Sequence, residues 1–381
     1  MKKFRGFLKI KWKQAFILSL NIFAVIHGAD GQSNNNKDAL EYYNKGLEHI
    51  KISEYDKAIN EFTQAIIHSY NFSNAYNARG WVFFSIGEYD KAIDDYTKVI
   101  ELNSNYANAY YNRGCVFSKT DNYEKAIDDY TKAIELDSNY ANAYYGRGCI
   151  FIRINDYERA IYDLTKVIEL DSDLAHAYYN RGWVFVRIND YERAIYDLTK
   201  ATELDSDYAK AYFYLGFSFS KKDDYNRAII YYTKAIELDS NVAQAYFNRG
   251  WIYTMIGDYD RAIDDYTKAI ELNPNFVNAY YNRSLIFSRI GEYDKAIDDY
   301  TKLIELDDSD LAQAYFNRGC AFSGIGEYDR AINDYTKVIE LDSNYAKAYY
   351  NRGLAYKAIG DFYQAIIDWE IALKINTSLL Q

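Results

Sequence analysis

ANAYYNRGCVFSKTDNYEKAIDDYTKAIELDSNY, the stretch from residue 107 to residue 140, decides the fold. Its first half spaces small and apolar residues by three and four, at Ala107, Tyr110, Gly114 and Phe117. Its second half does the same at Tyr123, Ala126, Ile127, Tyr130, Ala133 and Ile134. This spacing places each set on one face of an α-helix. Because residues 120–122 interrupt the pattern, we expect two helices that pack as a hairpin through the small residues Gly114 and Ala126.

The same unit is repeated along almost the whole chain. The glycine of its YNRG-like tetrad recurs at steps of 34 residues, with one serine and one step of 35: Gly46, Gly80, Gly114, Gly148, Gly182, Gly216, Gly250, Ser284, Gly319 and Gly353. The units start at residues 39, 73, 107, 141, 175, 209, 243, 277, 312 and 346 and run to residue 379. A single hairpin cannot bury both of its apolar stripes, whereas a stack of hairpins can. We therefore predict an all-α solenoid of ten stacked helix-turn-helix repeats, with no room for a second domain.

Local signals mark the ends of the helices. Five units carry glycine at the break between their two halves, which is typical of a helix end: Gly87, Gly257, Gly291, Gly326 and Gly360. The Asp-Ser-Asn that follows Leu136 is expected to end the second helix and to cap the next one. We interpret the acidic runs at 171–173 and 307–310 in the same way, because they lack the glycine and closing glutamate of a calcium loop.

This pattern resembles the tetratricopeptide repeat. The resemblance is carried by the 34-residue period and by aromatic, glycine and alanine residues at fixed unit positions, for example Tyr246, Gly250, Tyr253, Ala262, Tyr266 and Ala269. Pro274, the only proline, stands at the family's proline position. Arginine at unit position 7, His49 in place of an aromatic residue and Ser284 in place of a glycine depart from the family pattern. The resemblance implies a right-handed superhelix whose first helices line a concave groove for an extended peptide or a partner helix.

The first 29 residues differ from the repeats. Six basic residues precede an apolar run from Ala15 to Ile26, which suits a cleaved signal peptide better than a membrane span. An uncleaved membrane anchor and a plain basic extension remain alternatives. We expect a chain that is exported, to the periplasm, the cell surface or the medium, or anchored to a membrane by its N-terminus, rather than cytoplasmic. Residues 30–38 are predicted to be a polar linker.

Charge and composition exclude several classes of function. The chain carries 44 basic and 55 acidic residues, and the part after residue 29 carries 38 and 55, a net charge of −17. Such an acidic protein is a poor ligand for phosphate backbones, so we expect no nucleic-acid partner. His49, His68 and His176 share no metal-ligand spacing, and no nucleophile–base set or phosphate-binding loop occurs. We predict neither catalytic, metal nor cofactor-binding residues, and no enzyme.

The three cysteines occupy one unit position. Cys115, Cys149 and Cys320 stand at position 9, where other units carry tryptophan, phenylalanine or leucine, so we interpret them as packing residues. Cys115 and Cys149 lie one repeat apart, about 8–10 Å at helix-packing distance, which is too far for an undistorted disulfide. An odd number of cysteines leaves an intermolecular disulfide open.

Unit positions 7 and 23 change together. Position 7 is basic in nine units, at Lys45, Arg79, Arg113, Arg147, Arg181, Arg249, Arg283, Arg318 and Arg352. Position 23 is acidic in the same nine, at Glu61, Asp95, Asp129, Asp163, Asp197, Asp265, Asp299, Asp334 and Asp368. In the sixth unit they become Leu215 and Tyr231. We predict that the two positions touch and bridge the paired helices; independent surface charges are the alternative.

The two ends of the array have different compositions. The first helix carries Glu41, Lys45 and His49 where a terminal repeat needs polar residues. The last helix is apolar nearly all round, at Ile366, Ile367, Trp369, Ile371, Leu373 and Ile375. We expect this C-terminal face to be covered, by self-association or by a partner, unless Leu379 and Leu380 fold back over it.

The predicted ligand groove follows from the resemblance, which places positions 2, 5, 6, 9, 12 and 13 of each first helix on the concave face. Position 6 supplies an asparagine ladder: Asn112, Asn180, Asn248, Asn282, Asn317 and Asn351. Amides can bind a peptide backbone whatever its side chains. Position 13 supplies a basic row, Lys119, Arg153, Arg187 and Lys221, beside Tyr111, Tyr145, Tyr179 and Trp183. Cations at a helix C-terminus also complement its dipole without any ligand.

These observations favour a protein-interaction scaffold that binds an extended peptide or a partner helix of unknown identity in its groove. The alternative is a membrane-tethered assembly or chaperone-like component of the cell envelope.

Overall fold

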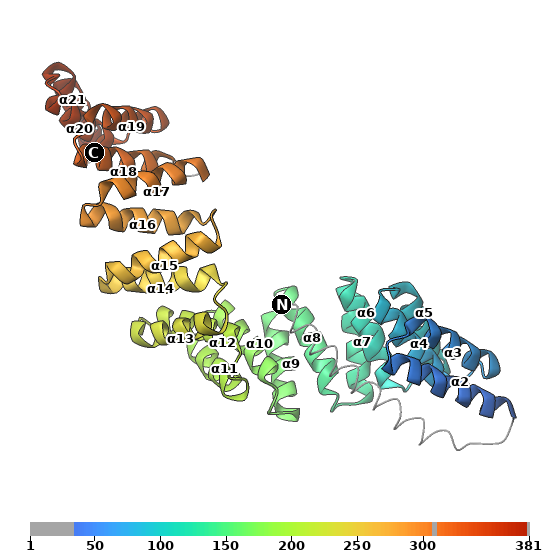
Figure 1. Ribbon diagram of the computed structural model, residues 1–381. Helices are drawn as coiled ribbons and strands as arrows, with labels where there is room; N and C mark the ends of the chain where they lie inside the picture. Colours follow the sequence, from blue (N-terminus) through green and yellow to red (C-terminus); the bar gives the residue numbers. More distant parts are fainter. Residues whose placement is uncertain (1–33, 307–310, 379–381) are drawn as a thin grey trace. The chain divides into compact units, whose positions relative to one another are not determined.

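The computed structural model describes residues 34–306 and 311–378, and in these ranges it contains twenty α-helices and no strand (Figure 1). The predicted all-α array of ten helix-turn-helix repeats is confirmed. The predictions for residues 1–29, for the turn at 307–310 and for Leu379 and Leu380 lie outside the described residues.

Each repeat contributes two consecutive helices. The first five repeats are formed by α2 (Asn34–Lys51), α3 (Tyr55–His68), α4 (Ser73–Ile86), α5 (Tyr89–Leu102), α6 (Ala107–Lys119), α7 (Tyr123–Leu136), α8 (Ala141–Arg153), α9 (Tyr157–Leu170), α10 (Ala175–Arg187) and α11 (Tyr191–Leu204). The other five are formed by α12 (Ala209–Lys221), α13 (Tyr225–Leu238), α14 (Ala243–Ile256), α15 (Tyr259–Leu272), α16 (Val277–Ile290), α17 (Tyr293–Leu306), α18 (Leu311–Gly324), α19 (Tyr328–Leu341), α20 (Ala346–Ala358) and α21 (Phe362–Ser378).

Helix α2 begins earlier than the linker prediction allows. It starts at Asn34, so residues 34–38 of the predicted polar linker are helical. In the other repeats a turn from the preceding repeat limits the first helix, whereas no repeat precedes α2 among the described residues. Lys37 and Asp38 in this extension are exposed. None of the helices between residues 34 and 378 combines the length and hydrophobicity needed to cross a membrane.

The break between the two helices of a repeat needs a left-handed residue. Five repeats place glycine there, as at Gly257 with φ 82°, and this confirms the predicted helix ends. The other repeats place a short polar residue there, such as Asn155 with φ 60°. Asparagine and aspartate tolerate this conformation better than other side chains, so both solutions give the same turn.

The predicted capping role of the Asp-Ser-Asn turns is wrong. Asp137 Oδ1 accepts a hydrogen bond from the Asn139 amide within the turn, at 3.0 Å, and no side chain caps α8. Residue 140 stands at that N-cap, where the Tyr140 ring packs on Tyr111 with centroids 5.0 Å apart. The side-chain caps lie instead before second helices, where Asp156 accepts from the Arg159 amide.

The two helices of a repeat approach closely at the glycine of position 8. A Cβ added to Gly114 would lie 3.0 Å from the Tyr130 ring, so the predicted close approach is confirmed. The next repeat completes the core: Ala279 and Ile286 of the eighth repeat join one buried cluster with Tyr266 of the seventh. Each first helix thus seals the preceding hairpin, as expected of a solenoid.

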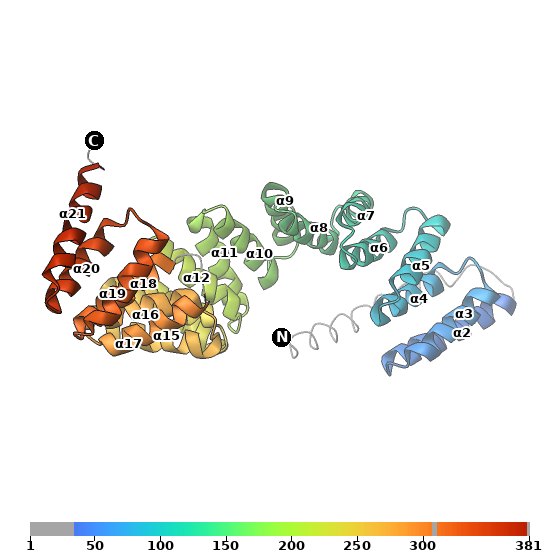
Figure 2. The same ribbon diagram turned by 90° about the horizontal axis from the view of Figure 1, so that it is seen from above.

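Contacts divide the chain into two compact units, Met1–Val184 and Phe185–Gln381, with the boundary inside α10. In the second unit the helices follow chain order from α12 to α21 in Figure 1, and Figure 2 shows the same unit from above. Successive first helices touch one another, as α12 touches α14 and α14 touches α16. Helices α12, α14 and α16 therefore form a continuous layer, which is part of the surface that the sequence predicts to bind a ligand.

An arginine ties neighbouring repeats together. Arg249 donates from Nε and Nη2 to the two carboxylate oxygens of Asp265, at 2.8 and 2.7 Å. The same bidentate contact between positions 7 and 23 is made by Arg79, Arg113, Arg147, Arg249, Arg283, Arg318 and Arg352. The predicted ion pair is confirmed there.

The sequence did not reveal the third partner of this arginine. Nη1 of Arg249 donates to Thr233 Oγ1 of the preceding repeat at 2.8 Å, so one guanidinium joins three helices. The same contact to the preceding threonine is made by Arg79, Arg113, Arg147, Arg181, Arg283, Arg318 and Arg352. Burial raises the pKa of Asp265, and Arg249 offsets that rise only in part.

Two repeats depart from this arrangement. In the first, the predicted contact is wrong: Lys45 pairs with Glu41 at 2.8 Å, and Oε2 of Glu61 is buried without a hydrogen-bond partner among the described residues. A lysine lacks the fork that lets arginine bind a carboxylate through two N–H groups. In the sixth, Leu215 is fully buried and Tyr231 stacks on Phe219 with centroids 5.2 Å apart.

Candidate functional site

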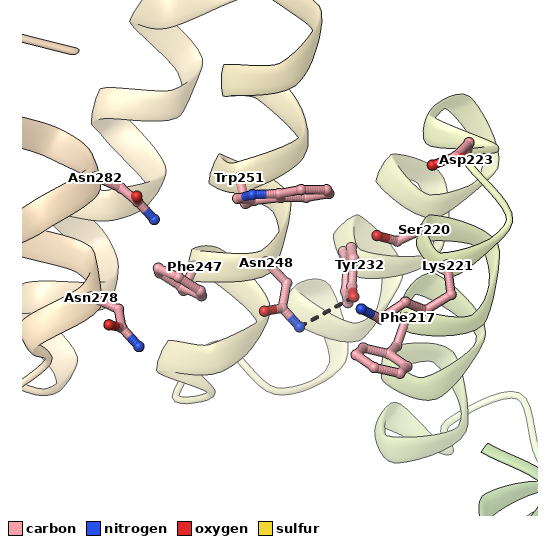
Figure 3. Close-up of a pocket in the computed structure, with 10 residues that line it drawn as sticks. All are labelled: Phe217, Ser220, Lys221, Asp223, Tyr232, Phe247, Asn248, Trp251, Asn278 and Asn282. Atoms are coloured by element: carbon pink, nitrogen blue, oxygen red, sulfur yellow. Dashed lines mark hydrogen bonds between the residues drawn. The ribbon is translucent and has the colours of Figure 1, made fainter. Parts of the chain in front are cut away.

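A hollow opens on the layer of first helices in the second compact unit. It has a volume of about 460 Å³ and lies across α12, α14 and α16. Its lining consists of Phe217, Ser220, Lys221, Asp223, Tyr232, Phe247, Asn248, Trp251, Asn278 and Asn282. Figure 3 shows the asparagines of α16 on one side of Phe247 and Trp251, and the residues of α12 on the other.

Three predicted groove residues meet in this hollow. Lys221, Asn248 and Asn282 come from three successive first helices and line the same cavity. Asn278 and the aromatic residues Phe217, Phe247 and Trp251 also line it; they stand at positions predicted to be concave but were not among the named site residues. The aromatic residues stand at positions 5 and 9, the same positions as Tyr145 and Trp183, so the signal for finding them was present in the period.

The asparagine ladder is partly occupied by bonds within the protein. Asn248 Nδ2 donates to Tyr232 Oη at 3.2 Å (Figure 3), and its Oδ1 accepts from Gln244 at 2.8 Å. Each side-chain amide has two N–H hydrogens and two oxygen lone pairs. One hydrogen and one lone pair of Asn248 therefore remain for a ligand. Burial raises the pKa of Tyr266 to about 12, and a hydrogen bond with the Asn282 side chain partly offsets this rise.

The remaining ladder residues of the second unit lie outside the hollow. Asn317 Oδ1 accepts from Gln313 at 2.8 Å, while its Nδ2 is buried with no partner among the described residues. Asn351 Nδ2 donates to Cys320 Sγ at 3.4 Å. At Asn248 and Asn351, position 6 therefore joins a first helix to the repeat before it.

The predicted basic row is divided among different environments. Arg153 is held by Tyr123 Oη at 3.1 Å and by Asp121 at 3.6 Å. Lys221 lies 5.3 Å from the centroid of the Phe217 ring, in the hollow that Asp223 also lines. Lys119 and Arg187 are exposed at the ends of α6 and α10. Lys221 lines this cavity together with the ladder residues Asn248 and Asn282.

The other predicted groove residues lie in the first compact unit. Asn112 Nδ2 donates to Asn77 Oδ1 at 3.1 Å, and Asn180 Nδ2 donates to Tyr145 Oη at 3.0 Å. Tyr179 is half-buried, and Trp183 meets the edge of Tyr157 with centroids 6.5 Å apart.

The prediction that Tyr111 faces a ligand is wrong. Its side chain is only 7% exposed. The ring packs between Tyr130, at 5.8 Å, and Tyr140, at 5.0 Å. The Tyr111 ring thus fills the space between its own second helix and the next repeat and is part of the core.

The cysteines are thiols in packed surroundings. All three are free, and burial raises the pKa of Cys149 to about 11. Burial also raises the pKa of Cys115, whose sulfur accepts from Tyr130 Oη at 3.4 Å. A raised pKa suppresses the reactive thiolate. Within residues 34–306 and 311–378, no group of three or more His, Cys, Asp or Glu side chains could hold a metal ion.

Family profiles recognise the repeat along most of the chain. Profiles described as tetratricopeptide repeat match residues 107–140, 209–242 and 243–276, residues 129–162 and 265–298, and residues 346–378. A profile described as TPR repeat matches residues 80–121, 184–223 and 324–360. The class defined by fold and sequence is thus a helical-repeat scaffold for protein interaction. The chain belongs to the tetratricopeptide repeat family.

The chain is similar to several solved structures. The C-terminal part of a TPR repeat-containing protein from Cytophaga hutchinsonii is 21% identical, with a TM-score of 0.54 over 62% of this chain and 97% of that one. YrrB, described as a TPR protein with an unusual peptide-binding site, is 28% identical, with a TM-score of 0.47 over 50% of this chain and 99% of its own. MamA is 29% identical, with a TM-score of 0.41 over 42% of this chain and 94% of its own. A comparison with curated protein sequences gives no match.

Proposed function

We propose that this chain is a non-enzymatic interaction scaffold that binds an extended peptide across α12, α14 and α16. The observation that carries the proposal is the 460 Å³ hollow in which Asn248, Asn282, Lys221 and Trp251 converge. Pockets with apolar walls and a few polar groups are the usual form of a ligand site. Family membership supports a protein or peptide as the partner.

The lining indicates the chemistry of the peptide. Asn248 and Asn282 offer donors and acceptors to its backbone, and Trp251 with Phe217 and Phe247 offers a wall for one apolar or aromatic side chain. Lys221 attracts an acidic residue, but Asp223 lines the same hollow and weakens that attraction. We therefore expect an aromatic anchor to dominate affinity, with a smaller acidic preference.

Binding to an immobilised library of extended peptides, followed by titration of the strongest binder, tests the proposal. The Asn248→Ala, Asn282→Ala double variant should bind at least about tenfold more weakly, the loss of two hydrogen bonds at about 1 kcal/mol each. Asn333→Ala, on the exposed side of α19, is the matched control and should bind normally. Normal binding by the double variant would place the ligand elsewhere.

A second pair of variants separates charge from the aromatic wall. Lys221→Ala should reduce the salt dependence of binding, whereas Lys222→Ala should not, because Lys222 is paired with Glu192 at 2.6 Å. Trp251→Ala should cost more affinity than either lysine change. A ligand that is indifferent to Trp251 would contradict the aromatic anchor.

We also propose that residues 1–29 carry the chain across or onto a membrane, where the scaffold would assemble envelope proteins. The basic residues before the apolar run from Ala15 to Ile26 support this proposal. N-terminal sequencing of the mature protein tests it. A start near Asp30 indicates export with cleavage, an intact N-terminus in the membrane fraction indicates an anchor, and an intact N-terminus in the soluble fraction contradicts both.

A further inference from the structure

The last helix presents an open apolar seam. Phe362, Ile366, Trp369 and Leu373 follow one another at spacings of four, three and four residues, so they lie along one face of α21. Ile366 is 54% exposed and Leu373 65% exposed. The same unit positions are covered inside the array, where Ile297 is 8% and Ile236 is 9% exposed. The seam is thus an interior surface that has no following repeat among the described residues.

A hollow lies beside this seam. It has a volume of about 510 Å³ and is lined by the apolar and aromatic residues Phe316, Ala346, Tyr350, Trp369, Ala372 and Leu373, and by the polar residues Lys347, Asn351 and Asn376. The indole of Trp369 is fixed by a hydrogen bond from Nε1 to the Tyr350 carbonyl at 3.2 Å. The hollow and the seam form a surface that suits a helix carrying one large apolar side chain.

The first repeat of another copy does not fit this surface. Inside the array, the seam of one repeat is sealed by positions 3 and 10 of the next first helix, such as the fully buried Ala75 and Val82. In α2 the same positions are Glu41 and Glu48, both exposed. Continuing the array head to tail would bury two carboxylates against apolar residues, which is strongly unfavourable.

The seam fits itself. Positions 362 and 373 are equally far from the centre of the seam, and so are positions 366 and 369. In an antiparallel pair of α21 helices, Phe362 of one copy therefore lies opposite Leu373 of the other, and Ile366 lies opposite Trp369. Phe362 is then brought beside the hollow at Leu373. A twofold axis repeats each contact, so that one surface serves both copies.

Charge also favours this end of the chain. Residues 346–379 carry four basic and three acidic residues, a net charge of +1, whereas residues 107–140 carry four basic and six acidic, a net charge of −2. An acidic chain repels its own copies over most of its length. The last repeat is a place where two copies can meet without that repulsion.

We infer that two copies of this chain associate tail to tail through α21, in an antiparallel pair sealed by Phe362, Ile366, Trp369 and Leu373. Because the groove across α12, α14 and α16 is formed by other repeats, the pair presents two peptide sites. The inference does not depend on the proposed peptide function, and the two can fail separately.

Analytical ultracentrifugation of the full-length chain tests the association. We expect a concentration-dependent dimer in the micromolar range and a dissociation constant at least tenfold weaker for Ile366→Asp, Leu373→Asp. Ile230→Asp is the matched control, because Ile230 is an equally exposed residue at a position where several repeats carry aspartate. A wild-type monomer at 100 µM, or an unchanged dimer in the Ile366→Asp, Leu373→Asp variant, would overturn the inference.

Disulfide trapping tests the geometry. Phe362→Cys chains mixed with Leu373→Cys chains should form crosslinked dimers under mild oxidation, whereas each variant alone should not, since identical positions lie about 16 Å apart along the helices at 1.5 Å per residue. Crosslinking of Leu373→Cys to Glu41→Cys chains would show a head-to-tail contact and overturn the antiparallel pair. The Asn248→Ala, Asn282→Ala variant should remain dimeric, which separates this test from that of the peptide site.

Discussion

The first and last repeats end the array in opposite ways. In α2 the surface that a preceding repeat would cover carries Glu41, Lys45 and Glu48, and Lys45 pairs with Glu41 toward solvent. In the last repeat Arg352 keeps the interior arrangement, with bonds to Asp368 and to Thr336 of the preceding repeat. The first repeat therefore has the polar surface of a terminal repeat. The last repeat has the side chains of an interior repeat, although no further repeat follows it among the described residues.

The difference shows which interactions depend on having a neighbour. Charged side chains at a terminal surface are solvated by water, so the polar end is stable by itself. An apolar surface gains stability only when something removes it from water. The C-terminal end therefore predicts an interaction, while the N-terminal end predicts none.

The largest expected effect comes from breaking the buried ion pair of the last repeat. Arg352→Leu leaves the almost fully buried Asp368 without its partner and should cost about 3–5 kcal/mol of unfolding free energy. Lys45→Leu should change the stability of the first repeat little, because both partners are exposed. Urea unfolding followed by hydrogen exchange in α20 and α2 measures both. A similar loss in the two variants would remove the distinction between the ends.

A rescue sharpens this prediction. The sixth repeat uses leucine and tyrosine at the two positions, so Arg352→Leu combined with Asp368→Tyr should recover much of the lost stability. Replacing a buried ion pair by well-packed apolar residues is often neutral. A double variant as unstable as Arg352→Leu alone would indicate that the threonine contact, rather than the buried carboxylate, dominates.

The second prediction converts the polar end into an interior one. Glu41→Ala with Glu48→Val gives α2 the small and apolar residues that seal a seam within the array. Its first repeat should then accept the C-terminal seam of another copy, producing species larger than a dimer in light scattering. Adding Leu373→Asp should abolish those species. Unchanged mass for Glu41→Ala, Glu48→Val would mean that the carboxylates are not what prevents head-to-tail stacking.

A smaller effect is expected at the helix caps. Asp190 accepts a hydrogen bond from the Arg193 amide at 3.1 Å, so Asp190→Ala should cost about 1 kcal/mol. Glu54 stands at the same place in the first repeat without a side-chain cap bond. Glu54→Ala should therefore accelerate hydrogen exchange in α3 less than Asp190→Ala does in α11. The reverse order would contradict the assigned cap.

The smallest effect is a difference in acid sensitivity. The bonds from Lys45 to Glu41 and from Lys57 to Glu54 lower the pKa of each glutamate below 4.5, so their stabilisation is present above that pH and is lost as the pH falls through the lowered values. Burial raises the pKa of Asp265 above 3.8, so protonation favours its folded state. Hydrogen exchange between about pH 5 and 3 should accelerate in α2 and α3 before α15. Simultaneous loss of protection would contradict it.

Much of the fold was predictable from local pattern. The period placed both helices of each repeat, Gly257 and its equivalents placed the turns, and the joint change at Leu215 and Tyr231 revealed the pairing of positions 7 and 23. These features depend on spacing within one hairpin, which the chain itself displays. The turn at Asp137 was misread because its carboxylate reaches the amide of its own turn before that of the next helix.

The candidate site was predictable only in part. Asn248, Asn282 and Lys221 could be named from their unit positions. Tyr111 also stands at a unit position predicted to be concave, but its side chain is buried. Whether a side chain at position 5 or 6 faces a ligand depends on the size of residues in the adjacent repeats, which compete for the same space.

The sequence by itself determined the architecture, because a period of 34 residues with two apolar stripes per unit is satisfied by stacked helical hairpins. Only the tertiary structure decided which asparagine side chains retain hydrogen-bonding groups for a ligand, and that the arginine at position 7 also binds a threonine of the preceding repeat. It also decided that the seam on α21 is exposed. The physical reason is that burial and hydrogen-bond competition are settled between repeats, by atoms far apart in the chain, whereas helix formation is settled within each repeat.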